Sequence, residues 1–184
     1  MKLFTCLGLP IIYGLPKMHK SVPKLRYIAA SCNSSIKGLD KIMTQCLSAV
    51  YQFMKSYCQG IMRYSGFHKM WILENSSQLK EEITRINNQS KAKCISTWDF
   101  STLYTTIPHD KLIAEMEKLL SFVFKAKKSE YISVKLGKAF FSNKEYKGYK
   151  NLKQIQVLFY LESLIDNIYV VFGNTLHTSK HTQK

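Results

Sequence analysis

Apolar residues recur every three or four positions over one long stretch of the chain. They are Ile36, Leu39, Met43, Cys46, Val50, Phe53 and Tyr57. This spacing places them on one face of an α-helix, and Ser34 or Ser35 is suited to cap its start. We therefore expect a long amphipathic helix that ends near Gly60.

Three further segments have helical periodicity: residues 76–88, with a serine near the start, the segment after Pro108, and residues 152–169. Pro108 suits a first helical turn, because the N–H that proline lacks has no intrahelical partner there. The apolar stripe of the helix after Pro108 consists of Leu112, Ile113, Met116, Leu119, Leu120 and Val123. We expect this stripe to face a core.

Strand patterns lie between the helices. The segment YGLPKMHKSVPKLRYIAAS, residues 13–31, is typical of two extended arms joined by a basic loop. KCISTWDF, residues 93–100, predicts a buried strand, and YISVKLGKAFF, residues 131–141, predicts a hairpin. IYVVFGNTLH, residues 168–177, predicts a strand that enters a turn at Gly173 and Asn174. Because strands alternate with helices, the expected fold class is α+β or mixed α/β.

Charge narrows the choice of partners. The 184 residues include 27 Lys and Arg against 12 Asp and Glu, a formal net charge of +15. Such an excess favours a polyanionic partner, with nucleic acid ahead of an anionic membrane. No apolar run approaches the roughly 20 residues of a membrane span, so we expect no membrane partner. The length suits one compact domain or a piece of a larger one.

Cysteine usage indicates the compartment. The five cysteines are odd in number and include no C-x-x-C pair, which favours neither a disulfide framework nor a zinc site. We expect an intracellular protein, nuclear or cytoplasmic. The alternative of a secreted basic protein would require cleavage near residue 15 and glycans at the sequons of Asn33, Asn75 and Asn88.

One carboxylate stands out because it follows an apolar run. Asp99 lies in STWDFSTLYTTIP, just before the helix that begins near Pro108. A short polar side chain after a strand often caps the turn into the next element. A carboxylate at the end of a buried strand can instead hold Mg²⁺ against a phosphate.

Several stretches resemble reverse transcriptases of Penelope-like and related retroelements. DFSTLYTTIP resembles the first palm motif of that family. YGLPKMHK followed by KLRYIAAS resembles its upstream fingers element, and SGFHKMWILENS and LIDNIYVVFGNTL resemble its intervening segments. The resemblance covers roughly residues 9–176.

The resemblance implies a single partial right-hand polymerase domain that acts with an RNA template and a DNA primer. Residues 1–90 would be fingers-like, residues 91–176 the first part of the palm, and residues 177–184 a divergent tail. Asp99 matches the family's first metal-binding aspartate, and the backbone carbonyl of Phe100 matches a further Mg²⁺ contact.

The resemblance also assigns residues to the incoming nucleotide. Tyr104 matches the aromatic residue under the nucleotide sugar, although a core tyrosine is the alternative. Arg26 matches the fingers arginine that contacts the triphosphate, and Lys20 or Lys17 could assist it. A solvated basic loop without such a role is the alternative for the two lysines. Many reverse transcriptases have a proline after that arginine, where this chain has Tyr27.

A second departure concerns catalysis. Polymerases hold two metal ions with carboxylates from two parts of the palm, and the family takes the second from an aromatic-x-Asp-Asp hairpin. This sequence contains no Asp-Asp pair. We therefore expect a reverse transcriptase domain truncated after its first palm motif, inactive alone. The alternative is a non-enzymatic basic module that binds RNA or DNA.

Overall fold

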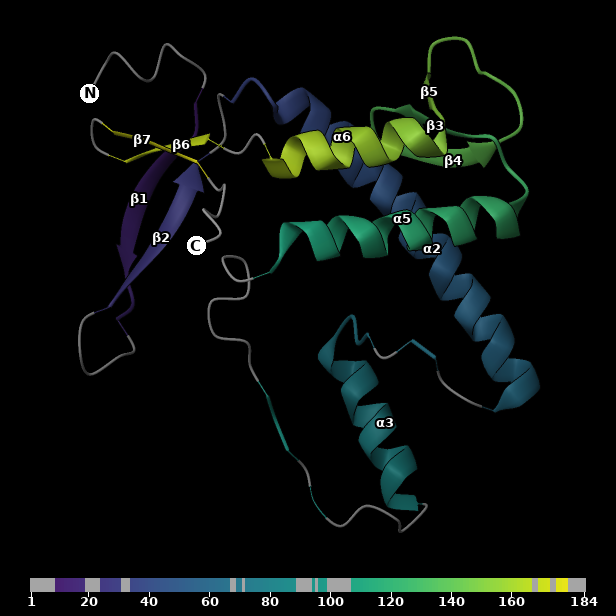
Figure 1. Ribbon diagram of the computed structural model, residues 1–184. Coiled ribbons are helices and arrows are strands. Elements are labelled where there is room, and N and C mark those ends of the chain that lie inside the picture. The colour runs from purple at the N-terminus through teal and green to yellow at the C-terminus, as the bar shows by residue number, and fades with distance from the viewer. Residues whose placement is uncertain are drawn as a thin grey trace. The chain divides into compact units, whose positions relative to one another are not determined.

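The structure is a computed structural model that combines helices and strands (Figure 1). It describes residues 9–18, 24–30, 34–66, 69–70, 72–88, 94, 96–98, 107–166, 169–172 and 175–178. These ranges contain four α-helices and seven β-strands, so the α+β class is confirmed. The chain divides into two compact units, Met1–Tyr51 with Ile107–Lys184, and Gln52–Thr106.

A four-stranded sheet contains the first two strands of the chain and the last two described ones. The strands are β1 (Ile11–Pro16), β2 (Leu25–Ala30), β6 (Tyr169–Phe172) and β7 (Thr175–Thr178), in the order β2-β1-β6-β7 (Figure 1). The β1–β2 pair is antiparallel, as the two predicted arms require. β1 and β6 pair in parallel through Ile11 and Val171, which brings distant parts of the sequence together. The two predicted arms and the strand predicted within residues 168–177 are confirmed as extended structure, whereas the turn predicted at Gly173 and Asn174 lies outside the described residues.

A second sheet has three antiparallel strands in the order β4-β3-β5. These are β3 (Tyr131–Lys135), β4 (Lys138–Ser142) and β5 (Lys150–Leu152). The predicted hairpin is β3–β4, whose tight turn places Gly137 at φ +81°, a backbone conformation that favours glycine. The sequence pattern did not predict β5, because three residues are too few to show alternation.

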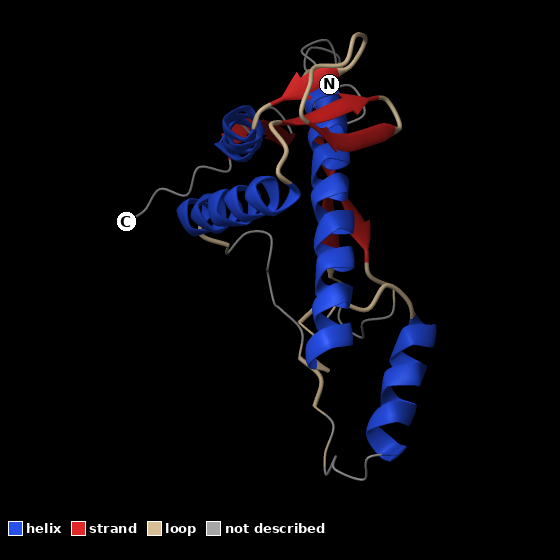
Figure 2. Ribbon diagram, turned by 90° about the vertical axis from the view of Figure 1, so that its right-hand side faces the viewer, coloured by secondary structure: helices blue, strands red, loops and turns tan. Residues whose placement is uncertain are grey.

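Helix α2 (Lys37–Ser65) is the longest element among the described residues (Figure 2). The Ser34 side-chain oxygen accepts a hydrogen bond from the N–H of Ile36 at 3.4 Å, consistent with the predicted cap. The expected end near Gly60 is wrong. A glycine lowers helix propensity by about 1 kcal/mol without stopping a helix, and α2 ends where Gly66 adopts φ +70°.

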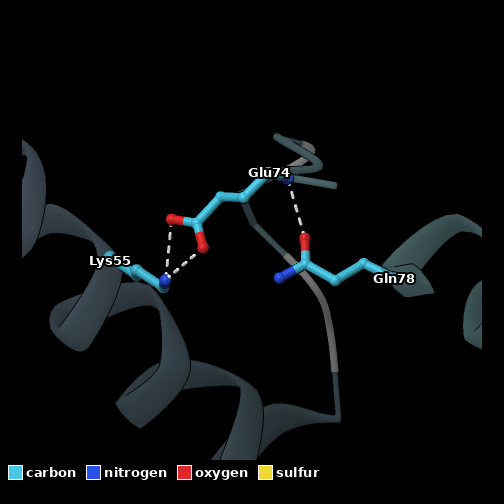
Figure 3. Close-up of polar contacts among 3 residues, drawn as sticks. All are labelled: Lys55, Glu74 and Gln78. Atoms are coloured by element: carbon cyan, nitrogen blue, oxygen red, sulfur yellow. Dashed lines mark hydrogen bonds and ion pairs between the residues drawn. The ribbon is translucent and has the colours of Figure 1, made fainter. Parts of the chain in front are cut away.

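Helix α3 (Ser76–Asn88) has the predicted bounds. Asn75 caps its start, because its side-chain oxygen accepts the N–H of Gln78 at 3.0 Å. The side-chain oxygen of Gln78 in turn accepts the N–H of Glu74. Lys55 Nζ of α2 lies 2.7 and 2.8 Å from the two carboxylate oxygens of Glu74, which ties α2 to the start of α3 (Figure 3).

Helices α5 (His109–Lys127) and α6 (Gln154–Asp166) pack against each other. Pro108 lies at the N-cap of α5, and Lys128 closes its C-terminal end in the left-handed conformation. The side-chain amide of Gln154 donates to the hydroxyl of Ser121 at 2.7 Å, which links the two helices. Helix α6 is shorter than the predicted segment. No described helix combines the length and apolar character that crossing a membrane requires.

The core collects apolar side chains from α2, α5, α6 and the three-stranded sheet. Its buried members are Met43, Cys46, Val50, Leu120, Val123, Phe124, Ile132, Val134, Leu152 and Val157. Leu120 and Val123 belong to the predicted stripe, and Phe124 extends it by packing edge-on against Phe141. Burial also raises the pKa of the Cys46 thiol to about 12, so Cys46 behaves as a small apolar side chain.

The predicted buried strand at residues 93–100 is wrong where the structure describes it. Residues 96–98 are exposed and form no strand, and Trp98 is 92% exposed. An apolar run becomes a buried strand only when a neighbouring strand satisfies its backbone groups, and no described strand pairs with these residues.

Candidate nucleic-acid interface

The β1–β2 hairpin carries a group of cations near its loop. Arg26 pairs with Leu15, and the backbone N–H of Lys17 donates to the carbonyl of Lys24 at 2.8 Å. Paired residues share a face of a sheet, and side chains two positions apart share it too. Lys17, Lys24 and Arg26 therefore lie on the same face of the hairpin.

These three cations are available to an anion. None of them forms an ion pair with a described carboxylate, since the ion pairs within the described ranges are Lys55–Glu74, Arg85–Glu82 and Lys118–Glu115. Arg26 and Lys24 are exposed and Lys17 is half-buried. A guanidinium presents a planar set of donors that matches phosphate. This face of the hairpin can therefore neutralise phosphate groups.

The hairpin exposes large apolar side chains as well as charge. Tyr13, Leu15, Leu25 and Tyr27 are each more than two-fifths exposed. On the face opposite the cations, the side chain of Leu25 lies over Gly14, where a Cβ would be 3.4 Å from the Leu25 Cδ1 atom. The hairpin is held by its backbone pairing and buries no side chain of its own.

Most of the predicted catalytic residues lie outside the described part of the chain. Asp99, Phe100, Tyr104 and Lys20 all do, so the structure leaves their geometry undescribed. Of the residues singled out with them, Arg26 and Lys17 are described and lie together. Within the described ranges, no group of three His, Cys, Asp or Glu side chains could hold a metal ion.

Sequence reasoning missed a second group of residues, on the three-stranded sheet. Phe140 lies edge-on to Tyr146, with ring centroids 5.1 Å apart, and to Tyr149 at 5.4 Å. Lys138 and Lys144 each place Nζ over one of these rings. A sixth member is Lys135, over the Tyr149 ring. We call these six residues the aromatic–lysine cluster.

A buried polar network holds the cluster in place. The hydroxyls of Ser133 and Ser142 lie 2.8 Å apart, and Ser133 donates to the side-chain oxygen of Asn151 at 2.7 Å. Asn151 also accepts the N–H of Tyr146 and donates to the carbonyls of Tyr146 and Tyr149. The loop between β4 and β5 is therefore fastened to the sheet.

The signal for the cluster is present in the sequence. Lysines and aromatic residues interleave along KLGKAFFSNKEYKGYK, residues 135–150. Such interleaving is typical of surfaces that bind single-stranded nucleic acid. The hairpin prediction covered only residues 131–141, and the loop that brings Tyr146 and Tyr149 back to the sheet lay beyond it.

Known proteins give no family assignment. No family model, curated protein or solved structure matches the chain.

Proposed function

We propose that the chain is the fingers and the first part of the palm of a retroelement reverse transcriptase, with a partial right-hand polymerase fold. We further propose that by itself it binds nucleic acid without extending a primer. The observation that carries the proposal is the order of its motifs, in which YGLPKMHK and KLRYIAAS precede DFSTLYTTIP. The pairing of the first two as strands β1 and β2 supports it.

The β1–β2 hairpin gives this assignment a physical rationale. A polymerase must neutralise the triphosphate of the incoming nucleotide, and Arg26 with Lys17 presents positive charge on one face of a short ribbon. Because the side chain of Arg26 is exposed, phosphate can reach its guanidinium group without displacing a core residue. In this proposal Tyr104 lies under the sugar and Lys20 assists Arg26.

The metal site limits what the chain can do. Mg²⁺ would activate the primer 3′-oxygen and hold the triphosphate in the intact family, with Asp99 and the carbonyl of Phe100 as its ligands here. The residue set does not fit two ions, because the sequence has no Asp-Asp pair and the described carboxylates form no metal-binding group. Loss of that electrostatic stabilisation removes the main contribution to catalysis.

Primer extension tests the proposal. We expect no extension of a DNA primer on an RNA template by this chain with Mg²⁺ and deoxynucleotides. We expect extension by a version completed with the family's glycine-bearing and Asp-Asp elements, and none after Asp99→Ala in that version. Activity of the short chain, or activity of the completed version that survives Asp99→Ala, would overturn the assignment.

The second candidate is a non-enzymatic basic module that binds RNA or DNA. The net charge of +15 and the cations of the β1–β2 hairpin favour it. It predicts an affinity for nucleic acid that falls steeply with salt, because phosphate contacts release counterions. It also predicts that Asp99→Ala leaves affinity unchanged and that the completed version extends no primer, which distinguishes it from the first candidate.

A further inference from the structure

Strand alternation gives the three-stranded sheet two chemically different faces. Ile132 pairs with Phe141 and with Leu152, so these apolar side chains share the face that enters the core. Ser133 pairs with Phe140, and Lys135 pairs with Lys138, so these four residues share the opposite face. The opposite face therefore carries rings and cations with a small buried polar network beneath them.

We propose that this opposite face, the aromatic–lysine cluster, binds single-stranded nucleic acid. Bases would stack on the rings while lysines bind the flanking phosphates. The inference does not rest on the reverse transcriptase assignment, because it uses only residues of the three-stranded sheet and its loop. It adds a contact surface separate from the β1–β2 hairpin.

The rings are suited to stacking because they are partly exposed and fixed. Tyr146 is 37% exposed, and Phe140 and Tyr149 are half-buried. Asn151 holds the backbone of both tyrosines, so little conformational entropy is lost when a base stacks on them. Every base has an aromatic face, which makes this contact tolerant of sequence.

The lysines are suited to exchange their present contacts for phosphate. Lys135, Lys138 and Lys144 lie 5.8, 5.6 and 5.4 Å from ring centroids, and such contacts are worth only about 0.5–1 kcal/mol at exposed sites. A phosphate offers each ammonium group a charge-assisted hydrogen bond instead. When the ammonium groups move to phosphates, the ring faces become free for bases.

Charge and space around the cluster favour a polyanion with protruding flat groups. Residues 135–153 contain six lysines and one acidic residue, Glu145. At the edge of the sheet, two members of the cluster, Lys135 and Tyr149, line a cavity of about 440 Å³ that extends toward α2 on the core side, where Ile42 and Val134 lie. Lys41 and Lys150 also line this cavity, which adds positive charge beside the cluster.

A single strand fits this surface better than a duplex does. A duplex stacks its bases on one another and presents mainly phosphates, so it would use the lysines and leave the rings without a role. A single strand uses both. An anionic membrane would also use the lysines, and the experiment below separates that outcome by including vesicles.

The test compares two charge-matched variants of the full chain. One replaces Lys135, Lys138 and Lys144 by Gln, and its control replaces the exposed lysines Lys80, Lys111 and Lys118 by Gln. The probes are a fluorescent mixed-sequence 20-nucleotide RNA, its duplex form, and vesicles containing phosphatidylserine. Anisotropy, or co-sedimentation for vesicles, is measured from 50 to 300 mM salt, and circular dichroism verifies the fold of each variant.

We expect the cluster variant to bind single-stranded RNA at least tenfold more weakly than the control variant. We also expect its salt slope to fall by about 2, because each phosphate contact on a single strand contributes about 0.7. Equal losses in the two variants would overturn the proposal. Equal affinity of the unaltered chain for duplex and single strand, or tighter binding to vesicles, would overturn it as well.

Ring variants test the stacking half of the proposal separately. Tyr146→Phe retains the ring and should retain affinity within about twofold. Tyr146→Leu removes the ring and should weaken binding by fivefold or more, since stacking on one base is worth about 1–3 kcal/mol. If the two substitutions have the same effect in folded protein, the rings do not stack on bases and the proposal fails.

Discussion

Two hairpins of the larger unit, β1–β2 and β3–β4, are built in opposite ways. β3–β4 inserts Ile132 and Val134 into the core, where both are almost fully buried, and its other face is tied by the Ser133–Asn151 network. β1–β2 buries no side chain of its own and exposes large apolar residues beside three cations. The comparison teaches that strand pairing alone does not indicate how much apolar surface a hairpin contributes to the core.

Burial explains the difference in physical terms. A hairpin with one face in a core gains roughly 25 cal/mol for each Å² of apolar surface removed from water. A hairpin with both faces exposed relies on its backbone pairing, which is marginal for two strands alone. β1 therefore depends on its contact with β6, which pairs with it at Ile11 and Val171.

Removal of a core side chain should have the largest effect. Ile132 is completely buried, so Ile132→Ala should lower the free energy of unfolding by about 2–5 kcal/mol through lost apolar contact and the cavity left behind. Leu15→Ala on β1 is the control, because Leu15 is 45% exposed. Its expected cost is about 0.5 kcal/mol or less. Urea unfolding measures both, and similar costs would contradict the contrast between the hairpins.

Loss of the polar network should have the next largest effect. Asn151→Ala leaves the buried hydroxyl of Ser133 without its amide partner and should cost about 1–3 kcal/mol. It should also weaken the near-ultraviolet circular dichroism of the tyrosines that Asn151 positions. Asn87→Ala, at an exposed site on α3, should change neither quantity measurably. An unaltered tyrosine signal in Asn151→Ala would show that the network does not fix the cluster.

Alkaline pH should weaken the core through Cys46. Its pKa is raised from 9.0 to about 12 by burial, so the folded chain keeps its proton while the unfolded chain loses it. This contribution to stability is therefore fully present below pH 9 and is lost as the pH rises from 9 toward 12. Between pH 8 and pH 10, the free energy of unfolding should fall by about 1 kcal/mol more in the unaltered chain than in Cys46→Ala, which lacks the thiol. Equal pH dependence of the two chains between pH 8 and 10 would contradict the burial of Cys46.

A charge substitution on the exposed hairpin should have the smallest effect on stability. Arg26→Gln should change the free energy of unfolding by no more than about 0.5 kcal/mol, because Arg26 has no ion pair with a described carboxylate. It should nevertheless weaken binding of a single-stranded oligonucleotide severalfold. Arg63→Gln, at the exposed end of α2, provides the same change in charge at another site. If the two variants bind the oligonucleotide with equal affinity, Arg26 does not contribute to phosphate binding.

Periodicity in the sequence predicted the elements that bury one continuous face. Met43, Cys46 and Val50, from the predicted stripe of α2, are buried in the core of the protein. Leu120 and Val123, from the predicted stripe of α5, are buried there too. The same reasoning failed at Trp98, where an apolar run was expected to be a buried strand and the residue is 92% exposed. Whether a strand forms depends on a partner from elsewhere in the chain, and a local pattern does not contain that information.

As with the fold, one part of the candidate site could be predicted from the sequence and another part could not. The sequence predicts two extended arms joined by a basic loop, and the pairing of these arms places Arg26 near Lys17. The proximity of these two cations could therefore be predicted from the sequence. The aromatic–lysine cluster was not predicted, because it depends on the hydrogen bonds between the Asn151 side chain and the backbone of Tyr146, which hold the loop between β4 and β5 against the sheet. A single side chain that bonds to several backbone groups leaves no periodic signal.

Hydrogen–deuterium exchange of the full chain, resolved by segment, tests the contrast between the hairpins most directly. Amides of β3 should exchange only through global unfolding, whereas amides of β1 and β2 should exchange through local opening at a rate at least tenfold faster. Single-stranded RNA should slow exchange at the β1–β2 loop end and over residues 138–149. Equally slow exchange of the two hairpins without RNA, or no change at either segment with it, would contradict the account.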